Sequence, residues 1–412
     1  MQTVQFPLPK AGIDQLSNET SLKKGAWRTA ENVDIDRSGQ VGVRQGYTKV
    51  VNNTDMHSVQ FAYQRSWLLA CIGPTLGRVS TTDNSVTSLI DTGSNSSVSI
   101  TEYNGNLYAV NQGGLFWSPA NETSMYRCGS LAPTPPTVEA VSTGGLVAGK
   151  YIVAISTVDA RGEESPLTTY QYVELTTDGG IQLTGLPLVS GGHVYIYVTP
   201  TNGDVLYLYA TPPATFSSHL ISGTPNGTTA STEFLTPFAG GEFVRWHNGR
   251  LYVASGDTLY YSDAFRPHLT RLDHNFVQFS GTISFVEAVQ GGIYVGDDRG
   301  VWFLDGGDPT KFVLKRTSGC LAVRGSSAIV PSEHFDPKVV QTNLPVAVWL
   351  STSGYAVGTA SGEVIELNYD TIRVSPGLVG STAFSIRQGR KQLTTLTSAR
   401  VNAVGLAEDS IT

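Results

Sequence analysis

The amino-acid sequence predicts an all-β protein: a β-propeller of about six blades that is interrupted by an inserted immunoglobulin-like β-sandwich. Three observations support this prediction. A hairpin pattern returns along the chain at near-equal intervals, and one interval is about 100 residues too long. In addition, no long segment keeps the 3.6-residue apolar period of a helix.

The composition favours many short strands joined by turns. Charged residues make up 15% of the 412 residues, and glycine contributes 44 of them. Ser, Thr and Asn are also abundant. The chain is long enough for one large β architecture plus a second module, so a two-domain protein with little helix is expected.

The repeated pattern consists of a turn residue, an apolar or aromatic strand, a turn of Gly and Asp, and a second short apolar strand. Five copies have their first strand at Leu68, Leu107, Leu251, Ile293 and Tyr355. In the first four copies the second strand follows eight positions later, at 76, 115, 259 and 301. Because a constant offset fixes the register of a hairpin, these segments are expected to fold alike.

The spacing between copies is that of propeller blades. The steps from 68 to 107 and from 251 to 293 are 39 and 42 residues, within the roughly 40–50 residues of one blade. The step from 293 to 355 is 62 residues, about one blade plus a loop of some twenty residues that 332–345 would supply. A weaker sixth copy lies at 387–393, and each hairpin is expected to form the inner part of its blade.

Closure of the ring is expected from the two ends of the chain. A free sheet edge invites aggregation, so propellers usually pair their ends within one blade. Strands near 41–43 and 399–404 are the candidates. A β-sandwich array with hairpins that recur by chance is the alternative fold, and the constant offset favours the propeller.

The insertion falls between the second and third copies. The step from 107 to 251 is 144 residues, which leaves about 102 after one blade period, the size of an immunoglobulin-like sandwich. A Pro-rich segment at 133–136 and a Gly-rich segment at 236–241 mark its ends. The expected domains are a first propeller part with an N-terminal hairpin (1–132), the inserted sandwich (133–236) and a second propeller part (237–412).

The segment from Tyr151 to Pro166 is similar to fibronectin type III-like modules. Such modules commonly contain a Tyr-x-Val strand followed by Asp-x-x-Gly-x-Glu-Ser-Pro, and Asp159, Gly162 and Glu164 fit this run. The resemblance implies a fibronectin-like fold for the insert. It says little about ligands, because these sandwiches have many roles.

Three polar motifs could carry chemistry, and each has a simpler structural interpretation. Residues 34–39 match the first half of a calcium loop, but Gln45 stands where the bidentate Glu belongs, so a plain turn is favoured. His268 and His274 lack metal-ligand spacing and are expected to be solvated loop residues. The carboxylates of 297–300 are expected to lie in the tight turn of a blade hairpin.

Signatures of catalysis are missing from the sequence. It contains no Gly-x-Ser-x-Gly elbow, no phosphate loop, no sialidase-type repeat and no carboxylate pair that could be nominated for glycoside hydrolysis. The tryptophans on or beside the repeats are expected to pack between blades rather than to stack on sugars; they are Trp67, Trp117, Trp246 and Trp302. We therefore predict a protein that is not an enzyme, with no catalytic, cofactor-binding or metal-binding residues and no cofactor.

Charge and targeting signals narrow the partners. A net charge of −7 argues against a surface that holds DNA or anionic lipid tightly. The N-terminus lacks the regions of a cleaved signal, and no stretch approaches the ~18 apolar residues of a membrane helix. Three widely spaced cysteines fit a reducing compartment, so we expect a soluble protein made in the cytoplasm without a membrane anchor.

The N-terminal run 30–47 resembles the opening of bacteriophage virion proteins of the podovirus-type tail nozzle or tail tubular kind. In those proteins a hairpin of the form Asn-x6-Gly-x4-Arg-x-Gly-Tyr leads into a propeller. The matching positions here are Asn32, Gly39, Arg44, Gly46 and Tyr47. The likeness in architecture extends over most of the chain and includes the fibronectin-like insertion.

This resemblance implies a structural protein of the phage tail, located in the virion. It would form a homo-oligomeric ring, commonly a hexamer, that extends the DNA channel and retains the genome until ejection. Other tail proteins such as an adapter, fibres or a plug would be its neighbours. DNA would pass without sequence-specific binding, and the low positive charge is compatible with this because contacts that neutralise phosphates would slow its passage.

Two other functions remain open at this stage. The first is a carbohydrate- or host-surface-binding propeller adhesin that would use exposed aromatic residues, with Trp246 and Tyr261 as candidates. The second is a glycoside hydrolase, which would require two carboxylates at catalytic separation. Because the sequence offers no such pair, the hydrolase is the least favoured of the three.

Overall fold

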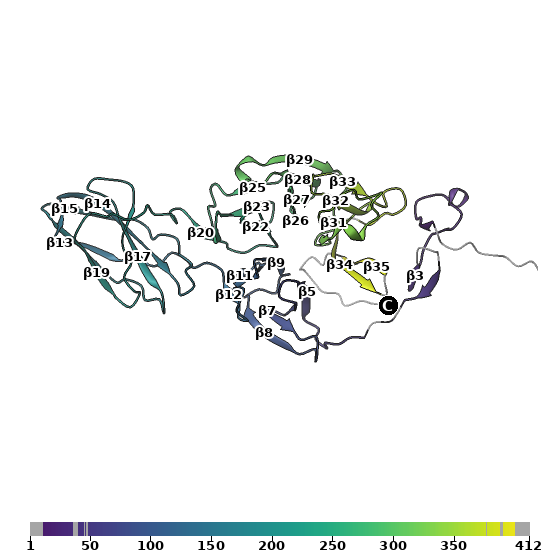
Figure 1. Ribbon diagram of the computed structural model, residues 1–412, viewed down its shortest axis with the longest axis horizontal. Helices are drawn as coiled ribbons and strands as arrows, with labels where there is room; N and C mark the ends of the chain where they lie inside the picture. The colour runs from purple at the N-terminus through teal and green to yellow at the C-terminus, as the bar shows by residue number, and fades with distance from the viewer. Residues whose placement is uncertain are drawn as a thin grey trace, which may run out of the picture.

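The computed structural model consists almost entirely of antiparallel β-strands (Figure 1). The structure describes residues 11–35, 40–44, 46, 48–375, 377–387 and 390–399. Within these residues, helix is limited to three short 3-10 turns, which are η1 (Glu19–Ser21), η2 (Pro309–Lys311) and η3 (Ser332–His334). The all-β prediction is confirmed.

Five β-sheets stand around a common centre as the blades of a propeller (Figure 1). Blade 1 contains β5 (Met56–Ala62), β6 (Trp67–Ile72), β7 (Thr75–Val79) and β8 (Val86–Asp91). Blade 2 contains β9 (Ser99–Tyr103), β10 (Asn106–Asn111), β11 (Gly114–Ser118) and β12 (Tyr126–Arg127). Each of these sheets follows the order of the chain, as expected for up-and-down blades.

Blades 3 to 5 follow the insertion. Blade 3 contains β20 (Thr236–Pro237), β21 (Phe243–His247), β22 (Arg250–Ser255), β23 (Thr258–Asp263), β24 (Arg266–Thr270) and β25 (Phe276–Gln278). Blade 4 contains β26 (Phe285–Val289), β27 (Gly292–Asp297), β28 (Gly300–Asp305) and β29 (Val313–Ser318). Blade 5 contains β30 (Ala328–Val330), β31 (Val346–Ser351), β32 (Gly354–Gly358) and β33 (Val364–Glu366).

The repeated segments form hairpins in a common register, as the constant offset predicts. Leu68 pairs with Val79, Leu107 with Ser118 and Ile293 with Leu304, always eleven positions apart. These hairpins are the middle strands of blades 1 to 4, and in blade 5 the hairpin supplies the last two strands, so the expectation that they form the inner part was wrong. The inner strands are instead the ones that precede each repeat.

Asn-Gly turns join the inner strand to the repeat in blades 2 and 3. Both central residues have positive φ, 48° and 77° at Asn104 and Gly105, and 43° and 81° at Asn248 and Gly249. Such angles define the type I′ turn, whose twist matches that of the flanking strands. Asn and Gly tolerate this left-handed backbone best, so the local sequence specifies these two hairpins.

Apolar side chains fill the junctions between successive blades. Leu69 and Leu76 of blade 1 meet Leu107 and Phe116 of blade 2. Equivalent clusters join blades 2 and 3, blades 3 and 4, and blades 4 and 5. This face-to-face packing excludes water from the junctions. It stabilises the fold by roughly 25 cal/mol for each Å² of apolar surface that is buried.

A two-stranded hairpin occupies the sixth position. It consists of β34 (Leu378–Arg387) and β35 (Arg390–Ala399), paired along their whole length. The weak sixth repeat therefore falls on a hairpin rather than on a four-stranded blade, and its turn residues 388 and 389 lie outside the described residues. Its inner face packs on blade 5 through Phe384 and Leu393.

The predicted closure strand at 41–43 does not enter the propeller. It forms β4 (Val41–Val43), which pairs with β3 (Val33–Ile35) in a separate hairpin. The second candidate, 399–404, lies outside the described residues beyond Ala399. In the described residues β35 pairs with no strand of blade 1, and in Figure 1 the β34–β35 hairpin stands apart from β5.

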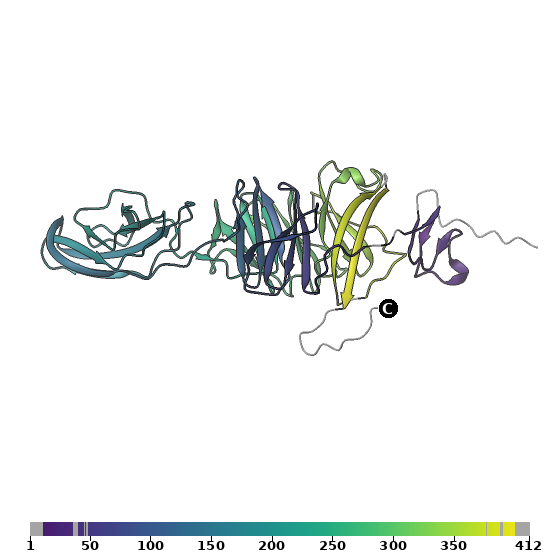
Figure 2. The same ribbon diagram turned by 90° about the horizontal axis from the view of Figure 1, so that it is seen from below.

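Two smaller units flank the propeller at opposite ends (Figure 2). The N-terminal unit contains β1 (Gly12–Ile13) parallel to β2 (Ala26–Trp27), together with the β3–β4 hairpin. The backbone N–H of Gln15 donates to the carbonyl of Thr371, next to the hairpin of the sixth position. The inserted sandwich lies at the other end of the molecule.

The insert is a seven-stranded β-sandwich of two antiparallel sheets. One sheet contains β13 (Thr137–Leu146), β16 (Gly179–Thr184) and β19 (Ser218–Ile221). The other contains β14 (Gly149–Val158), β15 (Gln171–Leu175), β17 (His193–Val198) and β18 (Tyr207–Ala210). Alternate residues of both sheets, among them Tyr151 and Ile181, form a core of their own.

Candidate assembly surface

The polar motifs singled out from the sequence are structural features where the structure describes them. Asp34 forms an ion pair with Arg44 across the β3–β4 hairpin, with 3.1 Å between Oδ1 and Nε. Residues 36–39 lie outside the described residues. Asp297 pairs with Gly300 at the end of the β27–β28 hairpin, and its Oδ1 accepts the N–H of Arg299, so the predicted tight turn is confirmed.

The expectation of a solvated loop was wrong for His268 and right for His274. His268 lies on β24 and is 7% exposed, and its Nε2–H donates to the carbonyl oxygen of Glu164 at 3.1 Å. Burial lowers the pKa of this imidazole. The sequence concealed this position because β24 pairs with β20, more than thirty residues upstream.

Groups that could perform metal chemistry do not converge. Among the described residues, no cluster of three or more His, Cys, Asp or Glu side chains could hold a metal ion. Cys71 and Cys128 are buried, and burial raises the pKa of the Cys71 thiol to about 11. In the same described part of the chain, no helix is sufficiently long and apolar to span a membrane.

The two aromatic residues nominated for sugar binding are packed within the propeller. Trp246 stacks on Tyr103, with ring centroids 4.1 Å apart, and lies 6.0 Å from Tyr108. Tyr261 is 5% exposed, and its hydroxyl donates to the carbonyl of His274. Neither ring offers a free face for a sugar, which supports the expected packing role of the tryptophans between blades.

Hydrogen bonds link the inner strands of successive blades around the centre. Gln60 of β5 accepts the N–H of Ile100 through its side chain, and Ser99 of β9 accepts the N–H of Val244. Arg245 of β21 then forms an ion pair with Glu287 of β26, with 2.6 Å between Nη2 and Oε1. These bonds satisfy polar groups that the blades bury.

The Arg245–Glu287 pair is a feature that the sequence did not reveal. The side chain of Glu287 is 1% exposed, and that of Arg245 is 19% exposed. Ser327 donates to the same Oε1 of Glu287 at 2.8 Å. The two partners belong to different blades, and only the similar positions of their strands in two repeats could have suggested their contact.

The opening beside the hairpin of the sixth position forms a seam between two sheet faces. One wall is the outer face of β34–β35, because Thr382, Phe384, Leu393 and Thr395 point the other way, toward blade 5. The outer face is made of alternating residues: Val379, Ser381, Ala383, Ser385, Gln392, Thr394, Leu396 and Ser398. None of these eight residues carries a charge, and Leu396 is 75% exposed.

The other wall of the seam is the face of blade 1 that points away from blade 2. Ala62 and Leu69 face blade 2, so by alternation Phe61 and its cross-strand partner Leu68 face the seam. Phe61 remains 41% exposed, and Tyr63, in edge contact with it, remains 75% exposed. In the other junctions, such a face is covered by the next blade.

Apolar contact across the seam is missing from the described residues. Their buried apolar clusters join every pair of successive blades, and the last of them joins blade 5 to the hairpin. No such cluster in this part of the chain joins the hairpin to blade 1. Similarly, the only described strand that pairs with β35 is β34. The seam therefore combines eight uncharged residues of the hairpin with aromatic side chains of a kind that neighbouring blades bury elsewhere.

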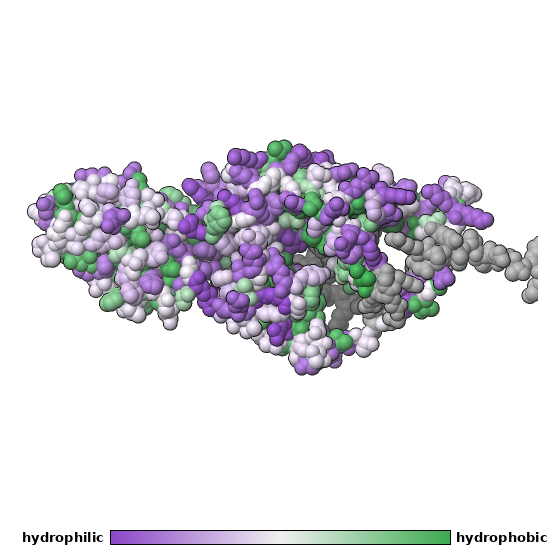
Figure 3. Space-filling view, in the orientation of Figure 1, coloured by the Kyte–Doolittle hydropathy of each residue, from purple (hydrophilic) through white to green (hydrophobic). Residues whose placement is uncertain are grey.

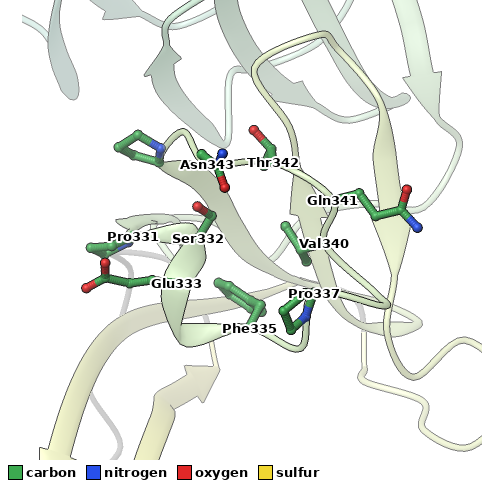
Figure 4. Close-up of a pocket in the computed structure, with 10 residues that line it drawn as sticks. Pro331, Ser332, Glu333, Phe335, Pro337, Val340, Gln341, Thr342 and Asn343 are labelled. Atoms are coloured by element: carbon green, nitrogen blue, oxygen red, sulfur yellow. The ribbon is translucent and has the colours of Figure 1, made fainter.

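The remaining surface offers few alternatives. Hydrophilic side chains dominate the visible face of the propeller, with apolar side chains in small separate patches (Figure 3). A cavity of about 400 Å³ lies in the loop between β30 and β31 (Figure 4). Pro331, Phe335 and Pro337 line it, and Glu333 is the one ionisable residue among its lining residues. Such a lining supplies no set of groups for catalysis.

Comparisons with known proteins show no close relative. No family model matches the chain, and no curated protein matches its sequence. BBS1N, solved in complex with ARL6DN, is 13% identical, with a TM-score of 0.33 over 82% of this chain and 88% of that chain. AztD of Citrobacter koseri is 12% identical, with a TM-score of 0.27 over 84% and 90%.

A third solved structure has the same level of similarity. Hsv2 of Kluyveromyces lactis is 8% identical, with a TM-score of 0.26 over 82% of this chain and 97% of that chain. At these values the likenesses say nothing about what this chain binds or does. The assignment as a propeller rests on the sheets and junctions described above.

Proposed function

We propose that this protein is a non-enzymatic structural component of a bacteriophage tail, which assembles with copies of itself into a ring. The observation that carries the proposal is the open seam. Eight uncharged residues on the outer face of the β34–β35 hairpin lie opposite exposed aromatic residues of blade 1 across it. Such surfaces suit burial against another copy, because a partner would cover apolar area without desolvating charges.

The arrangement of the three units supports the same proposal. The propeller carries one unit at each end of its long direction, so copies placed side by side would present inserts at one end and N-terminal units at the other (Figure 2). The N-terminal hairpin that resembles tail-nozzle proteins is one of these units. In the proposed ring, commonly a hexamer, the central opening would extend the DNA channel and retain the genome until ejection.

Neighbours and location follow from this proposal. The ring would belong to the virion, in contact with other tail proteins such as an adapter, fibres or a plug. DNA would pass through the common opening without sequence-specific binding. A net charge of −7 suits such a conduit, because few phosphate-neutralising contacts would hold the DNA back.

Assembly of the purified full chain tests the proposal. Mass photometry and sedimentation should show a closed oligomer whose population increases with protein concentration. Leu396→Asp, which places a charge on the outer face of β35, should shift the population toward monomer. Leu188→Asp is the matched control, because Leu188 is 70% exposed on the insert and lies outside the seam.

Two outcomes would contradict the proposed ring. One is a wild-type chain that stays monomeric at every concentration that can be reached. The other is equal assembly of the Leu396→Asp variant and the wild type. Absence of the chain from purified virions of the phage that encodes it would overturn the tail assignment even if the chain forms a ring.

A further inference from the structure

One turn of the insert, residues 159–166 between β14 and β15, reaches into the propeller. It contacts both β12 of blade 2 and β24 of blade 3. The carboxylate of Glu163 accepts the backbone N–H of Gly129 at 3.3 Å, and the Sγ of Cys128 lies 3.9 Å from its other oxygen. Cys128 is itself buried, and Glu163 is half-buried.

Other contacts secure the same turn. Nε2 of His268 lies 3.1 Å from the carbonyl oxygen of Glu164. The guanidinium of Arg161 lies 3.4 Å above the ring of Tyr126 and 3.8 Å from a carboxylate oxygen of Glu122. Insert and propeller are thus joined by a small set of polar contacts rather than by an apolar core.

The adjacent residue, Glu164, makes its side-chain contacts within the insert. The carboxylate of Glu164 accepts hydrogen bonds from Ser156 at 2.7 Å and from Tyr197 at 2.8 Å, both within the insert. It therefore fixes the shape of the turn, whereas Glu163 projects to the propeller. The Glu-Ser-Pro part of the fibronectin-like motif shapes the turn, and the residue before it makes the contact with blade 2.

The charged and titratable groups around Glu163 give it little compensation. Asp159 and Arg161 face it from its own turn. Cys128, just after β12, and Tyr108 of β10 face it from blade 2. On the blade 3 side, His268 faces Asp159, Glu164 and Arg266. In the described part of the structure Glu163 forms no ion pair, and burial raises its pKa to about 7. Burial likewise lowers the pKa of His268.

We propose that the 159–166 turn is a pH-dependent latch, which holds the insert against blades 2 and 3 when Glu163 is protonated and releases it when Glu163 is ionised. Release transfers the carboxyl proton to water and leaves a carboxylate that is better solvated outside the site. The linkers on both sides would then let the insert change its orientation. This device goes beyond the proposed ring, since it concerns the placement of one domain within each chain.

The direction of the pH effect follows from the raised pKa. A carboxyl group whose pKa rises on docking favours the docked state at low pH, and this contribution is lost as the pH rises from its ordinary value of 4.5 to about 7. That difference corresponds to about two orders of magnitude in the docking equilibrium. His268 acts in the opposite sense: because burial lowers its pKa, protonation opposes docking increasingly as the pH falls below its ordinary value of 6.5.

Fluorescence energy transfer in the full chain tests the latch. A Cys320→Ser background would carry dyes at Leu188→Cys of the insert and Asp83→Cys in the exposed turn of blade 1. Single-molecule measurements at nanomolar concentration keep the chains apart, so the result does not depend on ring formation. The transfer distribution should be narrow at pH 5.5 and broad at pH 8.5.

Two variants separate the latch from a general pH effect. Glu163→Gln keeps the size of the side chain without its charge, so its distribution should stay narrow at both pH values. Glu174→Gln, at an exposed position of β15, should respond like the wild type. An unchanged wild-type distribution, or a Glu163→Gln variant that broadens as the wild type does, would overturn the latch and leave the ring proposal standing.

Discussion

The junction between blades 4 and 5 and the seam between the hairpin and blade 1 are built on opposite principles. At the former, Trp349 is fully buried and stacks on Phe285, with ring centroids 5.1 Å apart. At the latter, Leu396 and Tyr63 are each 75% exposed. The arc of five blades is therefore stabilised by contacts within the chain, whereas the described residues at the sixth position leave large apolar side chains exposed.

The largest expected effect concerns the closed junction. Trp349→Ala should lower the free energy of unfolding by about 3–5 kcal/mol, because it removes a fully buried ring and leaves a cavity between two blades. Urea denaturation followed by fluorescence measures this loss. Leu396→Ala, on the exposed hairpin face, should leave the stability of the monomer nearly unchanged. Equal losses for the two variants would abolish the distinction between the junctions.

The buried ion pair between blades 3 and 4 gives the next effect. Glu287→Ala leaves the guanidinium of Arg245 without its partner and should destabilise the chain by about 3 kcal/mol. The double variant Arg245→Met with Glu287→Leu, which removes both charges, should lose less. Thermal denaturation compares the double variant with Glu287→Ala. If the double variant is the less stable, the ion pair contributes more than the free energy needed to bury its two charges.

Assembly should respond at the seam with little change in fold. Phe61→Asp on blade 1 should weaken ring formation at least tenfold, because a charge would be buried where apolar contact is expected. Its monomer should keep the far-ultraviolet circular dichroism of the wild type. Phe265→Asp is the control, since Phe265 is 90% exposed in a turn of blade 3, away from the seam. A larger effect of Phe265→Asp on ring formation would indicate that the assembly surface lies outside the seam.

The smallest effect is expected at a turn. Asn248→Ala should destabilise blade 3 by about 1 kcal/mol, because alanine tolerates φ of 43° less well than asparagine does. Asn248→Gly should be close to neutral by the same reasoning. Chemical denaturation of both variants distinguishes backbone strain from loss of the hydrogen bond that the Asn248 amide donates to Gly307.

The sequence predicts what local chemistry determines. Asn-Gly turns and alternating strands specify each hairpin, so the common register of Leu68, Leu107 and Ile293 could be recognised from spacing. The length of the insert was evident for the same reason, as an excess over one repeat. Neither result required knowledge of a contact between distant residues.

Long-range contacts were beyond the reach of spacing. The ion pair of Arg245 with Glu287 and the burial of His268 depend on which strands the propeller brings together within one chain. The open seam was also missed, because the expected closure assumed that 41–43 would return to the propeller. Strand β4 (Val41–Val43) instead pairs with β3 in a separate hairpin at the end of the molecule.

Electron cryo-microscopy of the purified full chain at high concentration tests the central claim most directly. We expect a closed ring around an open channel, in which the outer face of β34–β35 is covered by a neighbouring copy. A map of separate monomers, or of a ring whose interfaces leave Leu396 and Phe61 in solvent, would contradict it.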